Sequence, residues 1–159
     1  MILVGKGTVV TRDAKTPLIQ EGGVVLEGTV IREVGDFEEL KRKYPQAEQV
    51  DAKGQLIMPG LVNTHEHIYS AMARGLSIKG YNPKGFLDIL DGMWWTIDRH
   101  LTLTQTWHSA MATYMDCIKN GVTTVFDHHA SFGSVEGSLF RIAEAAKKLG
   151  VRTCLCYEV

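Results

Sequence analysis

Two histidines one residue apart are the strongest chemical feature of this sequence. His65 and His67 end a stretch, Leu56–His67, in which an apolar run resumes after a bend at Pro59 and Gly60. Alternate side chains of a β-strand project from the same face, so the two backbones would lie about 6–7 Å apart with their rings on one side. Neutral imidazole is a common ligand of zinc and iron. The pattern predicts a metal site, although two ordinary surface or core histidines would give the same letters.

A second pair of histidines lies where another strand should end. Val122–Asp127 is a β-branched run that predicts a strand, and His128 and His129 follow it directly. Neighbouring residues of a strand face opposite sides, so at most one of these two rings should face the site. One of them could bind substrate or support the metal site. The alternative is that one histidine donates to a loop carbonyl while the other is solvated.

Five further side chains are candidates for contact with a ligand. Trp94 and Trp95 could line a pocket for a flat ring, because aromatic rings stack on planar ligands, but their helical stripe equally favours core positions. Tyr69 and Ser70 follow the first histidine pair and could either reach a ligand or pack locally. For Arg74, a salt bridge that holds the adjacent loop is favoured over substrate contact.

The elements that must position these residues fall into two parts. Residues 1–57 read as a small β-rich unit with a hairpin at Gly28 and a short helix from Phe37, capped by Asp36. Residues 58–159 alternate strands with helices, which is typical of βαβ units around a parallel sheet. The helices expected in this second part cover residues 69–76, 86–99, 103–120 and 135–149.

Local signals define two of these helices further. Thr102 with Gln105 predicts a capping box at the start of the third helix, and an apolar stripe from Leu103 to Ile118 should be its buried face. Ser134 is expected to cap the last helix.

Composition and charge exclude several classes of partner. With 45% hydrophobic and 22% charged residues and a net charge of −1, the chain resembles a soluble globular protein and offers no electrostatic basis for binding nucleic acid or an anionic membrane. It has no apolar run of membrane-spanning length and no signal-peptide pattern, and its three cysteines do not suggest a disulfide framework. We therefore expect a cytoplasmic protein whose partner is a small molecule.

The stretch Pro59–His67, followed by Arg74 and Gly75, resembles the first barrel strand of the amidohydrolase superfamily. Within it, the chain is most similar to the aminohydrolase and chlorohydrolase branch, and there to SsnA-type aminohydrolases. The residues that carry this closer match are His65–Ser70, Trp94 and Trp95 with Asp98 and Arg99, and Asp127–Ser131. The resemblance implies an α/β fold, the N-terminal portion of a (β/α)8 metallo-dependent hydrolase barrel preceded by a small β-sandwich unit. Residues 1–57 would be part of a composite β-sandwich, and residues 58–159 the first three strands of an incomplete barrel.

The resemblance also implies a function. It is that of a metal-dependent aminohydrolase, a hydrolytic deaminase or dechlorinase, acting on a purine- or pyrimidine-like nitrogen heterocycle. His65 and His67 would bind one divalent metal ion, zinc first and iron second, while the catalytic residues would lie on later strands outside this chain. The full-length form would be a homo-oligomer.

Length leads to the last expectation. A closed barrel takes roughly 250 residues, so the 159 residues should be an N-terminal fragment that is inactive alone. Two alternatives stay open: a non-catalytic scaffold or interaction protein with the amidohydrolase fold, and one half of a two-chain enzyme.

Overall fold

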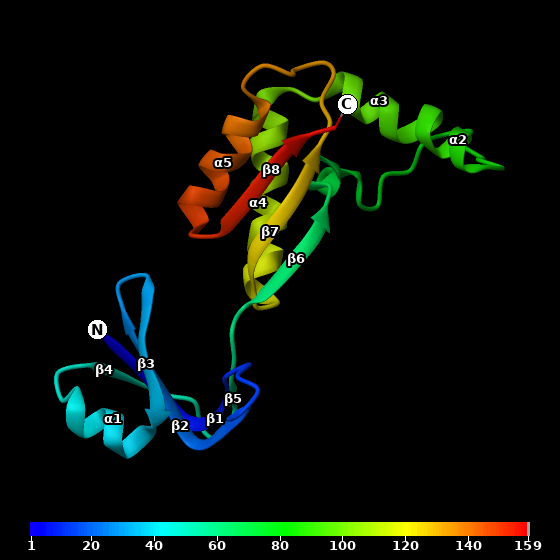
Figure 1. Cartoon of the computed structure of the whole chain (residues 1–159). Coiled ribbons are helices and arrows are strands. Elements are labelled where there is room, and N and C mark those ends of the chain that lie inside the picture. The colour runs from blue at the N-terminus through cyan, green and yellow to red at the C-terminus, as the bar shows by residue number, and fades with distance from the viewer. Residues whose placement is uncertain (159) are drawn as a thin grey trace. The chain divides into compact units, whose positions relative to one another are not determined.

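The computed structural model describes residues 1–158, which form two compact units, residues 1–59 and residues 60–158. Each unit has its own sheet (Figure 1). Each also has its own buried core. None of the helices in residues 1–158 is both long enough and apolar enough to cross a membrane.

The first unit is a five-stranded sheet with one helix. Its elements are β1 (Ile2–Val10), β2 (Leu18–Glu27), β3 (Val30–Asp36), α1 (Phe37–Lys43), β4 (Glu48–Asp51) and β5 (Leu56–Ile57). The strand order is β3-β2-β1-β4, and β5 also pairs with β1. The predicted hairpin is confirmed, since β2 and β3 are antiparallel and Gly28 turns between them with a φ of +59°. The predicted cap of α1 is also confirmed, because the Asp36 side chain accepts the Glu39 N–H at 2.9 Å.

The second unit carries the candidate site on a three-stranded parallel sheet in the order β6-β7-β8. Its strands are β6 (Leu61–Glu66), β7 (Val122–His129) and β8 (Arg152–Tyr157). Its helical segments are η1 (Ile68–Ala73), α2 (Phe86–Ile89), η2 (Leu90–Trp94), α3 (Trp95–His100), α4 (Leu103–Lys119) and α5 (Ser138–Leu149). The helices α4 and α5 pack together on one face of the sheet, while α2 and α3 extend beyond its end (Figure 1). Because the strands are parallel, their carboxyl ends meet at one edge of the sheet.

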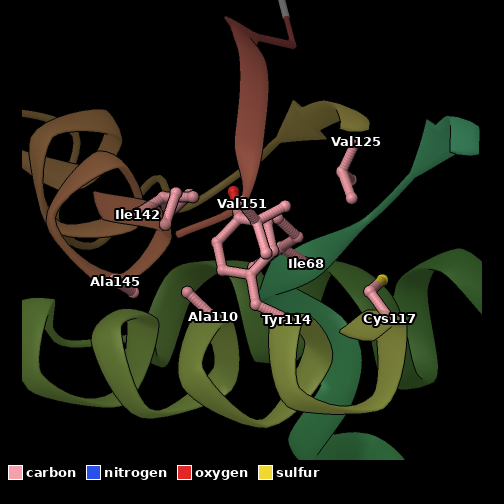
Figure 2. Packing of buried hydrophobic residues seen from close by; sticks show 9 residues of the cluster. Ile68, Ala110, Tyr114, Cys117, Val125, Ile142, Ala145 and Val151 are labelled. Atoms are coloured by element: carbon pink, nitrogen blue, oxygen red, sulfur yellow. The ribbon is translucent and has the colours of Figure 1, made fainter. Parts of the chain in front are cut away.

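The core of the second unit lies between the sheet and the helices α4 and α5 (Figure 2). Tyr114 extends from α4 into this core beside Ile68 and Val151, and its hydroxyl donates to Thr153 Oγ1 on β8 at 2.8 Å. Val125 of β7 is fully buried on the same face. The packing of α4 against β7 and β8 is therefore stabilised by burial of apolar surface and by the hydrogen bond from Tyr114 to Thr153.

The predicted start of α4 is confirmed, and the predicted start of α5 is wrong. Thr102 and Gln105 form the expected capping box, with the Gln105 N–H donating to Thr102 Oγ1 at 3.3 Å and the Thr102 N–H to Gln105 Oε1 at 2.9 Å. By contrast, α5 begins at Ser138 after Gly137, which has a φ of +84°, so Ser134 is not its cap. A left-handed residue at this point cannot belong to a right-handed helix.

Two further expectations about helices need correction. The single helix expected over residues 86–99 is divided by the π-helical turn η2. Its first apolar residues, Phe86 and Leu87, are also mostly exposed, at 71% and 69%. Ile118 is 45% exposed, so the predicted apolar stripe of α4 does not stay buried to its end. The buried face of α4 is instead formed by Thr106, Ser109, Ala110, Tyr114 and Cys117.

Candidate metal centre

Three histidines converge at the carboxyl ends of β6 and β7. The Nε2 atoms of His65 and His67 are 3.1 Å apart, and the ring centroid of His128 lies 4.9 Å from that of His65 and 6.0 Å from that of His67. One ligand nitrogen from each ring lies within 4.8 Å of the other two. The cluster forms because His65 is on β6, His67 follows its last residue, and His128 is on the neighbouring strand.

A backbone carbonyl fixes the orientation of one of these rings. His67 Nδ1 lies 3.0 Å from the carbonyl oxygen of His128. A carbonyl oxygen can only accept, so the proton of the neutral ring belongs on Nδ1 and the lone pair on Nε2. This tautomer directs the free nitrogen of His67 toward His65 and is the usual arrangement of a metal-binding histidine.

The chemistry of the three donors, and the spacing of two of them, fit a divalent metal ion. Zinc–nitrogen bonds of about 2.0–2.1 Å in tetrahedral geometry separate two ligand nitrogens by roughly 3.3 Å. The 3.1 Å between His65 Nε2 and His67 Nε2 is close to that value. A set of three neutral imidazoles also leaves the fourth position of a tetrahedral ion open. The cluster of His65, His67 and His128 could therefore hold zinc.

A cavity of about 310 Å³ adjoins this cluster. Four side chains proposed from the sequence as ligand contacts contribute to its wall, namely Tyr69, Ser70, Trp94 and Trp95, together with His67. The other lining residues are Phe86, Leu90, Asp98 and Glu158. The wall is thus largely aromatic and aliphatic, with a few polar groups, which is the composition of a pocket for a small organic ligand.

Asp98 carries part of the family resemblance but was not predicted as a site residue, and it is a polar residue of this cavity together with Glu158. It is only 3% exposed, and its Oδ1 has no hydrogen-bond partner among residues 1–158. Burial first, and then the negative charge of Glu158, raise the pKa of this carboxyl to about 6, although His67 and Arg99 oppose the shift. The signal available in the sequence was spacing, because Asp98 comes four residues after Trp94 and three after Trp95 and so shares their helical face.

Two predicted contact residues lie apart from this cavity. Arg74 lines a second cavity of about 310 Å³ that also adjoins His67 and Ser70. There its Nη1 makes an ion pair with Asp116 Oδ2 at 2.9 Å and so connects the end of η1 to α4. His129 is fully buried, with Nε2 2.8 Å from Ser131 Oγ and its ring against Tyr69 and Tyr157. Burial lowers the pKa of His129 to about 4, so its ring is neutral at pH 7. Of the second histidine pair, it is His128 that the structure brings to His65 and His67.

Known families and proteins match both units of the chain. Residues 56–159 match the amidohydrolase family, and residues 22–47 match the imidazolonepropionase-like composite domain of bacteria. The 5'-deoxyadenosine deaminase of Methanosarcina barkeri is 28% identical over 156 residues, which cover 98% of this chain and 33% of that protein. The 5-methylthioadenosine/S-adenosylhomocysteine deaminase of Pelotomaculum thermopropionicum is 25% identical over 154 residues, which cover 97% and 33%.

Solved structures show the same fold. A variant of the atrazine chlorohydrolase TrzN from Arthrobacter aurescens TC1, complexed with zinc and atraton, has a TM-score of 0.81 at 24% identity and covers 98% of this chain and 35% of its own. Guanine deaminase of E. coli has a TM-score of 0.74 at 23% identity, with coverages of 98% and 37%. The chain therefore spans about a third of the length of these proteins. The predicted fold class, a β-sandwich unit followed by the start of a (β/α)8 barrel, is confirmed. With about two thirds of its residues in the family match and a histidine cluster at its strand ends, the chain belongs to the amidohydrolase family.

Proposed function

We propose that this chain is the N-terminal part of a metal-dependent aminohydrolase that removes an amino group, or in a variant of the same reaction a chloride, from a nitrogen heterocycle. The observation that carries the proposal is the convergence of three imidazole nitrogens within 4.8 Å at the strand ends. His65 on β6 and His67 directly after it are two of the proposed ligands, and His128 is the third ligand within this chain. The remaining ligands and the groups that move protons belong, in this proposal, to barrel strands beyond these residues.

In this proposal, histidines of this chain bind the ion, and a backbone carbonyl orients one of them. A divalent ion, zinc before iron, would supply a hydroxide nucleophile at neutral pH by lowering the pKa of water. His67 presents Nε2 because the His128 carbonyl accepts its Nδ1–H at 3.0 Å. His65 completes the pair from the same strand.

The adjoining cavity supports a planar, nitrogen-containing substrate. Trp94 and Trp95 offer aromatic surface for stacking, and the unpartnered Oδ1 of Asp98 can accept a hydrogen bond from an N–H or O–H of the ligand. Tyr69 and Ser70 line the same wall. The relatives described above are named for adenosine derivatives, guanine and triazines, all of them nitrogen heterocycles.

Three finer points belong to this proposal. The substrate is purine- or pyrimidine-like, the subgroup is that of the SsnA-type aminohydrolases, and the full-length protein is a homo-oligomer. Contact of Arg74 and His129 with the substrate stays a prediction. Arg74 lines the second cavity beside His67 rather than the one with the tryptophans, and His129 lines neither of the two.

Zinc binding by the 159-residue chain tests the proposal directly. Equilibrium dialysis would compare the wild type with a His65→Ala/His67→Ala variant, with His128→Ala, and with His108→Ala as the matched control. His108 is an exposed histidine of α4 whose Nδ1 lies 2.9 Å from the Thr104 carbonyl oxygen, outside the cluster. We expect about one zinc per chain in the wild type and the control, none in the double variant, and a weaker affinity without His128. Zinc that remains in the double variant, or a wild type without zinc, contradicts the proposed site.

Ligand binding tests the cavity independently of the metal. Tryptophan fluorescence titrations with adenosine, guanine and a triazine would be repeated on Trp94→Phe, Trp95→Phe and Asp98→Ala. Quenching that saturates in the wild type and weakens in these variants supports the assignment. Equal affinities in Asp98→Ala and the wild type would mean that the carboxylate does not contact the ligand.

A further inference from the structure

The residue that follows His67, Ile68, has both of its backbone polar groups bound by buried side chains. The Ile68 N–H donates to Asp127 Oδ1 at 2.7 Å, and the Ile68 carbonyl oxygen accepts the Ser109 hydroxyl at 2.6 Å. Asp127 is 1% exposed, and Ser109 and Ile68 are fully buried. The two holding groups come from β7 and α4, which are separate elements of the same unit.

Asp127 supplies an acceptor at the point where the strand ladder ends. The last register pair between β6 and β7 joins Glu66 to Asp127. The chain then leaves the strand at His67, with φ −125° and ψ 76°, and enters η1. Beyond this pair the Ile68 N–H is bound by the carboxylate of Asp127 in place of a strand carbonyl. The Asp127 side chain thus extends the hydrogen bonding between β7 and the chain after β6 as far as Ile68.

We infer that Asp127 is a positioning residue for His67, and that Ser109 is its counterpart on the next peptide, at the carbonyl of the same residue, Ile68. The Asp127 carboxylate fixes the peptide plane between residues 67 and 68, and this plane sets where the His67 ring meets the His128 carbonyl and His65. Its purpose, to prepare a metal ligand, rests on the proposed function.

The surroundings of Asp127 favour this role over contact with a substrate. Asp127 is not among the residues that line the cavity beside His67. Its second oxygen, Oδ2, is buried and has no hydrogen-bond partner among residues 1–158. Burial raises the pKa of this carboxyl to about 7, although the bond from Ile68 opposes the shift. What the site needs is one correctly placed acceptor oxygen, and an asparagine would provide the same oxygen without a charge.

The test separates the acceptor from the charge. We would measure zinc affinity, the hydrogen-exchange rate of the Ile68 amide, and the His67 tautomer by ¹⁵N NMR in Asp127→Asn, Asp127→Ala and Ser109→Ala. Ser138→Ala is the matched control, because Ser138 is also fully buried and bonded to a backbone carbonyl, that of Val135, but lies in α5. Loss of a group that orients a ligand typically weakens metal binding about 10–100-fold.

We expect Asp127→Ala to weaken zinc binding about 10–100-fold, to speed Ile68 exchange, and to reduce the Nδ1-protonated form of His67. Asp127→Asn and Ser138→Ala should stay within about 3-fold of the wild type, and Ser109→Ala should fall between them. If Asp127→Ala does not fold, the same three quantities are compared between Ser109→Ala and its control, Ser138→Ala. Equal zinc affinities and Ile68 exchange rates in all variants, or equal losses in Asp127→Asn and Asp127→Ala, overturn the inference.

Failure of the proposed function would give a different result. A wild type that binds no zinc contradicts the metal site, while the Ile68 exchange rate and the His67 tautomer in the metal-free variants still decide whether Asp127 positions His67. Unchanged values in Asp127→Ala would overturn the inference even where zinc binds as proposed.

Discussion

Replacing Asp98 with asparagine should change how the stability of the second unit depends on pH. The carboxyl of Asp98 is 3% exposed and lacks a partner for Oδ1 within the described residues. Burial raises its pKa from an ordinary value of 3.8 to about 6. In the unfolded chain the same group should titrate near its ordinary value.

The sign and size of the effect follow from this difference in pKa. Between about pH 4 and pH 6 the native state holds a proton that the unfolded chain has released, so the free energy of unfolding falls as the pH rises through this window. A shift of about two units corresponds to roughly 3 kcal/mol at 1.36 kcal/mol per unit. Asparagine does not titrate, so the free energy of unfolding of Asp98→Asn should not decline in this window. The variant should therefore become more stable relative to the wild type as the pH rises toward 7.

Urea unfolding at pH 4, 5, 6 and 7 measures this difference. Tryptophan fluorescence reports on the second unit alone, since that unit contains all three tryptophans, Trp94, Trp95 and Trp107. Asp91→Asn is the matched control, because Asp91 is an exposed acid of the neighbouring turn η2. A difference between Asp98→Asn and the wild type that stays constant across this pH range, or that changes in the opposite direction, refutes the reasoning.

The remaining predictions concern the stability of the same unit and are read from urea midpoints. Tyr114→Phe removes the hydrogen bond to Thr153 and should cost about 1 kcal/mol, whereas no loss would mean that solvent replaces the bond. Gly133→Ala would bring a methyl group to 2.2 Å from the Arg99 carbonyl oxygen, so we expect a loss of about 1–3 kcal/mol, and a neutral result would show that the loop moves aside. Arg74→Met removes an ion pair whose arginine is 68% exposed, so the change should stay below about 1 kcal/mol, and a larger loss would assign it a structural role.

Elements with a local chemical signal were predictable from the sequence. The capping box of Thr102 and Gln105 and the cap at Asp36 depend only on residues three apart, and both form as expected. The start of α5 was not predictable in this way. Ser134 has the right side chain for a cap, but its N–H is bonded to the Ser131 carbonyl in a turn. Ser131 is in turn held by the distant Tyr157 hydroxyl, so long-range contacts decide the outcome.

The candidate site was predictable only up to the register of its strands. Strand alternation places His65 and His67 together and allows only one of His128 and His129 to join them, but the sequence does not say which. In the structure Val125 is fully buried toward the helices, whereas Phe126 is 40% exposed on the opposite face. An exposed phenylalanine reverses the usual apolar pattern, so the burial of neighbouring residues could not assign the histidine pair.

The two buried acids of this unit, Asp98 and Asp127, are the same residue type but have different surroundings. Asp98 and Asp127 are each 3% exposed or less, and burial raises the pKa of both. Asp98 lines the cavity beside His67, so its free oxygen can meet a ligand, and removal of its charge should weaken binding. Asp127 instead accepts the amide after His67, so an uncharged oxygen in the same position should serve as well. Substitution by asparagine therefore distinguishes the two roles, because it should affect the ligand through Asp98 and leave the metal site intact at Asp127.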